Sequence, residues 1–363
     1  MTEPVYDKLA DALDMRTGMP FPKIQELLAI LEFLYTPQEA ELASKMPLSP
    51  VPAETLAGDI GSDLKEVESI LEGMADKGLV FPYDKPGVGR LYNLMALLPG
   101  VFEIQFIKGD INDRAKKLAR LFQDYFDIIR QPGATATRSY TTVPFSRVIA
   151  VETEIPAGVE IHPYDKVTEY ITMSDHIAVG TCYCRHHAEL MGNTCDRPKD
   201  VCMSFGPGAK FFAERGFSKL VSKEEALRIL DRAEKAGLVH CSSNTSKSIG
   251  FICNCCSCHC GIMASIKNAA SPSMAATSSF ILSVDEEMCM GCGDCVERCQ
   301  VDAITMEGEI VVRDVERCIG CGLCVSTCTV EALKLVPKEE APVPPVNQQE
   351  LGAAMIASRQ QSI

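Results

Sequence analysis

Apolar residues recur at helical spacing along the first eighty residues, with short polar breaks between the stripes. Intervals of three and four between apolar positions predict helices over 24–34 and 53–60. Two further helices are expected over 36–46 and 63–78, because each opens with a side chain that typically caps a helix. The N-terminal part of the chain is therefore expected to be mainly helical.

A β-hairpin is expected after these helices, because the apolar segments 79–81 and 91–92 flank the turn-forming pair Pro86-Gly87. Helices followed by such a hairpin resemble a winged-helix domain, a fold that often binds DNA. The helix over 63–78 would be the recognition helix. Its charged residues are mostly acidic: Asp63, Glu66, Glu68, Glu72 and Asp76 against Lys65 and Lys77. Since such a surface repels phosphates, we expect this domain to dock to a protein, with DNA binding as the less favoured alternative.

A further amphipathic helix is predicted over 114–129, with basic residues early and aromatic residues late. The basic residues would suit an acidic partner, whereas the apolar positions are those of an ordinary helix packed on a core. The pattern favours the second interpretation, which places Leu118, Leu121, Tyr125 and Ile128 in the core.

Eight cysteines near the C-terminus form two runs of the same spacing, C-x2-C-x2-C-x3-C. The first run is Cys289, Cys292, Cys295 and Cys299, and the second is Cys318, Cys321, Cys324 and Cys328. Each cysteine of the second run lies 29 positions after its partner in the first, which indicates an internal duplication. Apolar segments 303–306 and 310–312 predict a hairpin between the runs.

This spacing resembles that of bacterial two-cluster ferredoxins. The resemblance implies two [4Fe-4S] clusters with interdigitated ligands. One cluster would be held by Cys289, Cys292, Cys295 and Cys328, and the other by Cys318, Cys321, Cys324 and Cys299. Gln300 and Thr329 stand where the family usually has proline, which weakens the turn chemistry and leaves the ligand set intact. Two zinc sites are the alternative, but zinc-binding cysteine pairs are normally separated by a longer loop.

Ten further cysteines lie in the middle of the chain. They are Cys182, Cys184, Cys195, Cys202, Cys241, Cys253, Cys255, Cys256, Cys258 and Cys260. The C-x-C-R segment at 182–185 and the C-N-C-C segment at 253–256 precede the ferredoxin runs. Together they resemble a group of iron–sulfur proteins of anaerobic bacteria and archaea, and this resemblance implies electron transfer. Ten thiolates suffice for one or two further iron–sulfur clusters.

The partition of these ten thiolates stays open. One arrangement gives Cys182, Cys184, Cys195 and Cys202 to one cluster and members of the 253–260 group to another, whereas a mixed arrangement draws on both segments. The neighbours Cys255 and Cys256 are expected to point in different directions. The alternatives to iron–sulfur binding are a zinc site, buried structural thiols and a redox-active thiol pair.

Four histidines and an arginine accompany these thiolates. His186, His187, His240 and His259 are expected to serve mostly as hydrogen-bond partners or solvent-facing residues, although a histidine ligand would raise the potential of a cluster. Arg185 is a candidate donor to cluster sulfur, and its charge would offset the negative charge of a cluster.

Charge and composition limit the classes of function that the chain can have. The 363 residues carry a formal net charge of −14, which argues against nucleic acid as the main partner. The chain has neither a signal-like N-terminus nor an apolar run long enough to span a membrane. Eighteen cysteines in such a chain indicate metal ligands and not disulfides, so we expect a cytoplasmic protein of an anaerobe.

We therefore expect a multidomain α+β protein. Its parts are a flexible arm (1–20), a winged-helix-like domain (21–98), a helical connector (99–145), a cysteine-rich iron–sulfur domain (146–268), a hinge (269–280), a dicluster ferredoxin domain (281–336) and a tail with a short helix (337–363). The favoured function is electron transfer to or from a flavin or metal oxidoreductase, as a subunit and not as a self-contained enzyme. A redox-responsive regulator and a catalytic iron–sulfur site in the middle domain are the alternatives.

Overall fold

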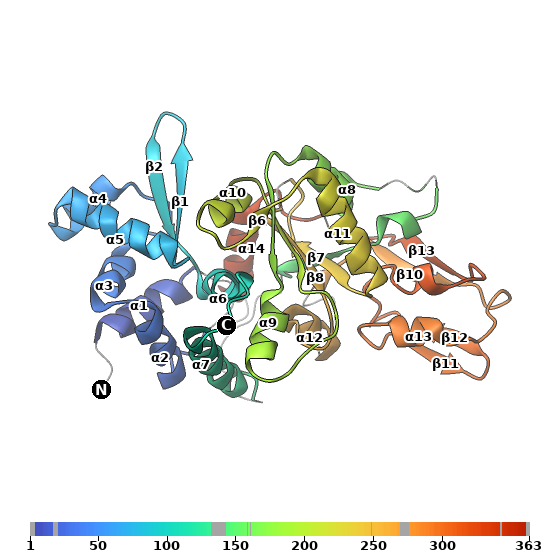
Figure 1. Cartoon of the computed structure of the whole chain (residues 1–363). Coiled ribbons are helices and arrows are strands. Elements are labelled where there is room, and N and C mark those ends of the chain that lie inside the picture. Colours follow the sequence, from blue (N-terminus) through green and yellow to red (C-terminus); the bar gives the residue numbers. More distant parts are fainter. Residues whose placement is uncertain are drawn as a thin grey trace.

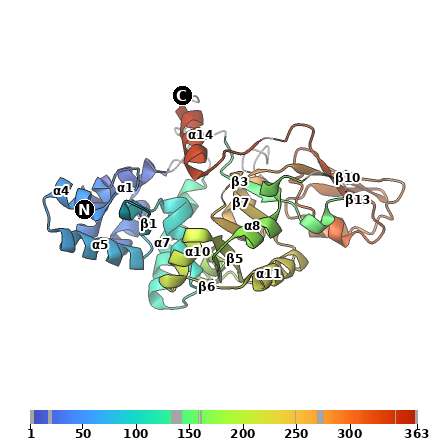
Figure 2. The ribbon, with the colours of Figure 1, turned by 90° about the horizontal axis from the view of Figure 1, so that it is seen from above.

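Three bodies follow one another along the molecule. The computed structural model describes residues 4–16, 21–131, 143–157, 159, 161–247, 249–268, 276–341 and 343–360. N-terminal helices, a central sheet with its own helices and a C-terminal module lie from left to right in Figure 1, and Figure 2 shows the same order from above. No helix within these described ranges is both long enough and apolar enough to cross a membrane.

Five helices and a hairpin form the N-terminal body. They are α1 (Pro4–Asp14), α2 (Gln25–Leu34), α3 (Pro37–Lys45), α4 (Ala53–Ile60), α5 (Leu64–Asp76), β1 (Val80–Lys85) and β2 (Gly89–Leu94). Thr36 and Glu39 form a capping box at α3, and Asp63 caps α5, so these two expected helix starts are confirmed. The resemblance to a winged-helix domain stays a prediction.

The expectation of a loose arm is wrong for residues 4–14. These residues form α1, which packs on α3, and Leu9 is completely buried. The hydroxyl of Tyr6 donates a hydrogen bond to the carbonyl oxygen of Tyr35 at 3.0 Å. Tyr6, Leu9 and Leu13 recur at helical spacing, so their burial stabilises a helix that its short length alone would not.

Helices α6 (Phe102–Ile107) and α7 (Asp113–Ile129) continue the N-terminal core and do not form a separate connector. The ring of Phe102 packs edge to face on Phe106 and Phe122. As expected for an ordinary amphipathic helix, α7 buries Leu118 and Tyr125, whereas Leu121 and Ile128 are half-buried. The apolar face of α7 therefore belongs to the same core as α1 to α5.

A seven-stranded sheet forms the central body. In spatial order its strands are β6 (Lys219–Leu220), β4 (Ile177–Thr181), β5 (Asp200–Phe205), β8 (Phe251–Cys255), β7 (Val239–Ser243), β3 (Ser146–Ile149) and β9 (Ala276–Thr277). All neighbours are antiparallel except β3 and β9. Apolar residues of α8 (Val167–Met173) and α11 (Lys223–Lys235) cover one face. The other face carries cysteines and is covered by α9 (Tyr183–Leu190) and α12 (Gly261–Asn268).

The C-terminal module contains two small antiparallel sheets and a short helix. They are β10 (Phe280–Val284) with β13 (Leu333–Pro337), β11 (Ile304–Glu307) with β12 (Ile310–Arg313), and α13 (Asp294–Arg298). The β11–β12 hairpin is the one that the sequence predicts. The duplication extends to the backbone, because Asp302 and Glu331, 29 positions apart, have φ of 54° and 56°. Gly320 has φ of 59°, and a Cβ there would lie 1.9 Å from the carbonyl oxygen of Phe280, so glycine is required.

The segments that flank the module are only partly described. Residues 269–275 of the expected hinge lie outside the described residues, and Ala276–Thr277 join the central sheet as β9. The tail contains α14 (Gln348–Gln360), the short helix that was expected there, with Leu351 and Met355 buried. Helix α10 (Gly206–Glu214) follows β5 and packs on β4 and β1.

Candidate iron–sulfur and metal sites

Four thiols line one cavity in the C-terminal module. Cys318, Cys321 and Cys324 come from the second run, and Cys299 comes from the end of the first. Burial raises the pKa of Cys321 to about 12, and the charges of Cys318 and Cys299 add to the shift. Thiols buried together resist ionisation, and a bound cation offsets that cost. The donor set fits the second [4Fe-4S] ligand set that the resemblance implies.

The other four cysteines of the module range from buried Cys295 through half-buried Cys289 and Cys328 to exposed Cys292. Cys289, Cys295 and Cys328 pack in one cluster around Leu282, and Cys292 is exposed. Burial raises the pKa of Cys295, and the charges of Cys292 and Cys289 add to the rise. This donor set fits the first ligand set, with one edge open to solvent.

Gln300, which replaces the family's proline, links the module to the central body. Its buried side chain accepts hydrogen bonds through Oε1 from the backbone N–H and the hydroxyl of Ser257, both at 3.1 Å. Arg298 donates to the carbonyl oxygens of Glu234 at 2.6 Å and Lys235 at 3.2 Å, at the C-terminal end of α11. Gln300 and Arg298 therefore connect the C-terminal module to the central body.

Seven middle-domain cysteines lie on the face of the sheet opposite α8 and α11. These sheet-face thiols are Cys182, Cys184, Cys202, Cys241, Cys253, Cys255 and Cys260. Side chains alternate along a strand, so β8 directs Cys253 and Cys255 to the same face. The register of β7 and β8 places Cys241 directly opposite Cys253.

The sheet-face thiols form a continuous chain of contacts. The contacting pairs are Cys182–Cys202, Cys202–Cys253, Cys253–Cys255, Cys255–Cys241, Cys255–Cys260 and Cys260–Cys184. Hydrogen bonds from Cys202 and Cys255 lower the pKa of Cys253. The hydroxyl of Tyr183 lies 3.4 Å from the sulfur of Cys253. These seven donors suffice for at least one four-thiolate cluster, and they come from both cysteine segments, as the mixed arrangement requires.

Two ionisable residues beside the sheet-face thiols, Arg185 and Glu103, have shifted pKa values. Burial would lower the pKa of Arg185, but the charges of Cys182 and Cys202 and the thiol of Cys256 outweigh it and raise the pKa. Arg185 is therefore a fixed positive charge beside the thiols, as the sequence suggested. Burial raises the pKa of Glu103 to about 7, and the charges of Cys253 and Cys260 add to the rise. No spacing or periodicity in the sequence connects Glu103 with the cysteines, so sequence reasoning missed it.

Cys195, Cys256 and Cys258 lie apart from the sheet-face thiols, together with His259. Their ligand atoms all lie within 4.8 Å of one another. The structure thus groups Cys195 with Cys256, Cys258 and His259, and not with Cys182, Cys184 and Cys202. The physical reason is that the loop between α9 and β5 carries Cys195 to the apolar cluster under α11.

The neighbours Cys255 and Cys256 point in different directions, as expected. Cys255 is one of the seven sheet-face thiols, whereas Cys256 belongs to the apolar cluster under α11. Arg185 donates to the sulfur of Cys256 at 3.6 Å. Burial opposes ionisation of Cys256, but this hydrogen bond and the charge of Arg185 outweigh it and lower the pKa of the thiol.

Three of the four histidines are occupied by contacts other than cysteine. His186 contacts Glu189 and the carbonyl oxygen of Asp110, and His187 contacts the carbonyl oxygen of Ala119 at 3.0 Å. The two ring nitrogens of His240 contact Asn254 at 2.6 Å and Glu234 at 3.0 Å. Of the four, His259 is the histidine that shares a compact group with thiols.

Comparison with known proteins supports the C-terminal assignment. Residues 282–335 match the family of 4Fe-4S dicluster domains. This match confirms the expected iron–sulfur module at the C-terminus. No curated protein and no solved structure gives a significant match to the chain.

Proposed function

We propose that this chain is an iron–sulfur electron-transfer protein or subunit, in which the C-terminal module and the sheet-face thiols hold clusters along one path. The observation that carries the proposal is the direct packing of the two donor regions. The charge of Cys241 adds to the raised pKa of Cys321. The N–H of Val151, beside the sheet, donates to the carbonyl oxygen of Cys321 at 2.9 Å. Both cysteines belong to one apolar cluster.

The residues between the two donor regions exclude water from the proposed electron path. Iron–sulfur clusters take up and release single electrons when bound. Buried apolar side chains fill the space between the thiol sets, among them Val148, Val239, Ile319 and Leu323. Such packing excludes water and holds the ligand-bearing segments at fixed positions. Arg185 adds a positive charge on the side of the sheet-face thiols.

The outer end of the path fits a basic partner surface. Cys292 is exposed there, and Met288 and Met290 beside it are 43% and 67% exposed. The same exposed segment carries acidic residues at Asp285, Glu286, Glu287, Asp294 and Glu297. We infer that a redox partner, a flavin or metal oxidoreductase with basic residues around its own centre, docks at this end.

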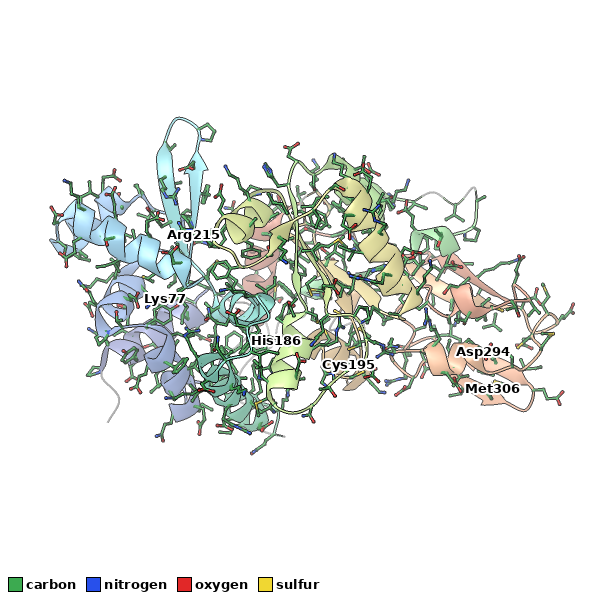
Figure 3. The ribbon with its side chains drawn as sticks, in the orientation of Figure 1. Lys77, His186, Cys195, Arg215, Asp294 and Met306 are labelled. Atoms are coloured by element: carbon green, nitrogen blue, oxygen red, sulfur yellow. The ribbon has the colours of Figure 1, made fainter. Side chains whose placement is uncertain are left out.

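The regulator alternative has less support, because the C-terminal end of the acidic helix α5 binds other parts of the chain. Arg215, which follows α10 and is labelled in Figure 3, forms ion pairs with both Glu72 and Asp76. Arg90 of the hairpin also binds Glu72, at 2.8 Å. The acidic residues at this end of α5 therefore serve contacts within the protein.

Electron paramagnetic resonance of the anaerobically reduced full chain tests the proposal. We expect spin–spin interaction between the C-terminal clusters and a third centre at the sheet-face thiols. Cys253→Ala should remove this interaction and leave the spectrum of a two-cluster ferredoxin. Ile252→Val, which shortens the neighbouring β8 side chain on the opposite face of the sheet, is the matched control and should keep the interaction. A spectrum that Cys253→Ala leaves unchanged would contradict the proposal.

A further inference from the structure

Four metal-binding side chains converge at the edge of the apolar cluster under α11, outside the proposed electron path. Cys195 comes from the loop between α9 and β5, whereas Cys256, Cys258 and His259 come from the turn between β8 and α12. The two segments meet because Cys195 and Cys256 both pack on the apolar residues under α11. In the view of Figure 3, Cys195 lies in the lower middle, between the N-terminal body on the left and the C-terminal module on the right.

The compactness of this Cys3His group indicates one ion and not a cluster. Its four ligand atoms lie within 4.8 Å of one another. Around one tetrahedral zinc ion, with Zn–S of about 2.3 Å, neighbouring sulfurs stand about 3.8 Å apart. A cubane cluster carries each ligand on a different iron atom, so its ligand atoms must stand farther apart. In the described part of the chain, the thiols of the C-terminal module do not form a group this compact.

The surroundings of the Cys3His group are those of a metal site. Nδ1 of His259 is buried and has no hydrogen-bond partner among the described residues. Arg197 donates to the sulfur of Cys258 at 3.0 Å, and Arg185 donates to the sulfur of Cys256 at 3.6 Å. Three thiolates around a divalent ion leave a net charge of −1, and two arginines beside the sulfurs offset it. Such donors to ligand atoms are typical of the environment of a metal.

We propose that Cys195, Cys256, Cys258 and His259 bind one zinc ion. Three thiolates and one imidazole in tetrahedral arrangement are a donor set that zinc favours, and four protein ligands leave no open position. The ion would thus be structural. It would fix the turn that carries Ser257, whose N–H and hydroxyl bind Gln300 of the C-terminal module.

X-ray absorption at the zinc edge, on the full chain produced anaerobically with iron and zinc both supplied, tests this proposal directly. We expect about one zinc per chain, with three sulfurs at about 2.3 Å and one nitrogen at about 2.0 Å. This measurement uses the unaltered protein, so it does not depend on the folding of any variant. A chain that is loaded with iron but contains no zinc, or a zinc spectrum without this ligand set, would overturn the proposal.

Metal analysis of two variants locates the ion. Cys195→Ala should lose the zinc and keep its iron and sulfide, whereas the matched control Cys292→Ala should lose iron and keep the zinc. Loss of about four irons and four sulfides from Cys195→Ala would instead assign an iron–sulfur cluster to this group. These outcomes do not depend on whether the chain carries electrons, so the zinc proposal and the electron-transfer proposal can fail separately.

Discussion

Cys299 belongs to the first cysteine run by sequence and lies with the second run in space. It lines the same cavity as Cys318, Cys321 and Cys324. The backbone N–H of Ala303 donates to the sulfur of Cys299 at 3.2 Å. This placement makes the assignment of ligands testable one residue at a time.

We expect Cys299→Ala to damage the cluster held by the second run and to spare the one at Cys289, Cys292 and Cys295. Cys328→Ala should have the reciprocal effect. Each variant should lose about four irons and also unfold more readily, since cluster binding and folding are coupled. Iron analysis and electron paramagnetic resonance of the two reduced variants check this. If each substitution harms the cluster of its own run, the interdigitated assignment is wrong.

His187 makes a second prediction at the residue scale. The side chain of His187, a residue of α9, is buried against Phe102 and Phe106 of α6 and Phe126 of α7. Burial lowers the pKa of His187 to about 4. An unfolded histidine has a pKa of about 6.5, so between these values the unfolded chain binds more protons. The free energy of unfolding therefore falls as the pH falls through this range, by up to about 3 kcal/mol from this group.

His187→Gln, which keeps a donor for the carbonyl oxygen of Ala119, should flatten this fall. The measurement is the thermal midpoint of the full chain as a function of pH. His162→Gln changes an exposed histidine and is the matched control. Identical pH dependence in the wild type and His187→Gln would show that His187 contributes nothing to it.

The roles of individual cysteines could be predicted where the ligands are close in sequence. The two C-terminal runs have a characteristic cysteine spacing, so their iron–sulfur role follows from the sequence alone. The ten middle cysteines could not be partitioned, because their contacts depend on how strands pair. Cys202 contacts Cys253 because β5 and β8 are neighbours in the sheet. Cys195 lies in a different cluster from Cys184 because of the course of the loop between α9 and β5. His259 carried no local signal beyond its position between Cys258 and Cys260.

At the scale of elements, α5 and α10 join the N-terminal body to the central sheet. Arg215 binds Glu72 and Asp76, and Phe211 and Phe217 form an apolar cluster with Ala75 of α5. The helices α2 to α5 and the first hairpin followed from apolar spacing and caps in the sequence. Their docking did not, because a cross-domain ion pair leaves no periodic signal.

We expect Arg215→Ala to loosen this contact. The change removes one partner from two carboxylates and should lower the free energy of unfolding by about 1 kcal/mol, since the group is only partly shielded from solvent. Hydrogen exchange should become faster in α5 and α10. Arg228→Ala breaks an exposed ion pair with Glu225 within one helix and should change neither quantity measurably. Equal effects of the two substitutions would show that Arg215 does not hold the interface.

Helix α1 is an element that the apolar spacing of the sequence could have predicted. Tyr6, Leu9 and Leu13 are spaced like a helical stripe, but the segment is short and stands at the end of the chain. Only its packing on α3 makes it a stable element. Seven strands of the central sheet contribute to the cysteine-bearing body, and several of them are too short for their alternation to be recognised alone.

At the scale of the whole molecule, the proposed path runs from the surface of the C-terminal module to the sheet-face thiols. The exposed Cys292 stands at one end, Cys321 and Cys241 meet in the middle, and the sheet-face thiols continue inward to Cys184. The N-terminal body covers the inner end of the path, where Phe102 of α6 packs edge to face on Tyr183 of α9. This arrangement favours electrons entering or leaving through the C-terminal module.

The most direct test is to count iron, sulfide and electrons in the same anaerobic sample of the full chain. The account predicts more than eight irons per chain, about twelve for one further cube, with equal sulfide and a reductive titration that consumes about three electrons. Eight irons, eight sulfides and two electrons would mean that only the C-terminal module holds clusters, and the proposed path through the sheet-face thiols would be wrong.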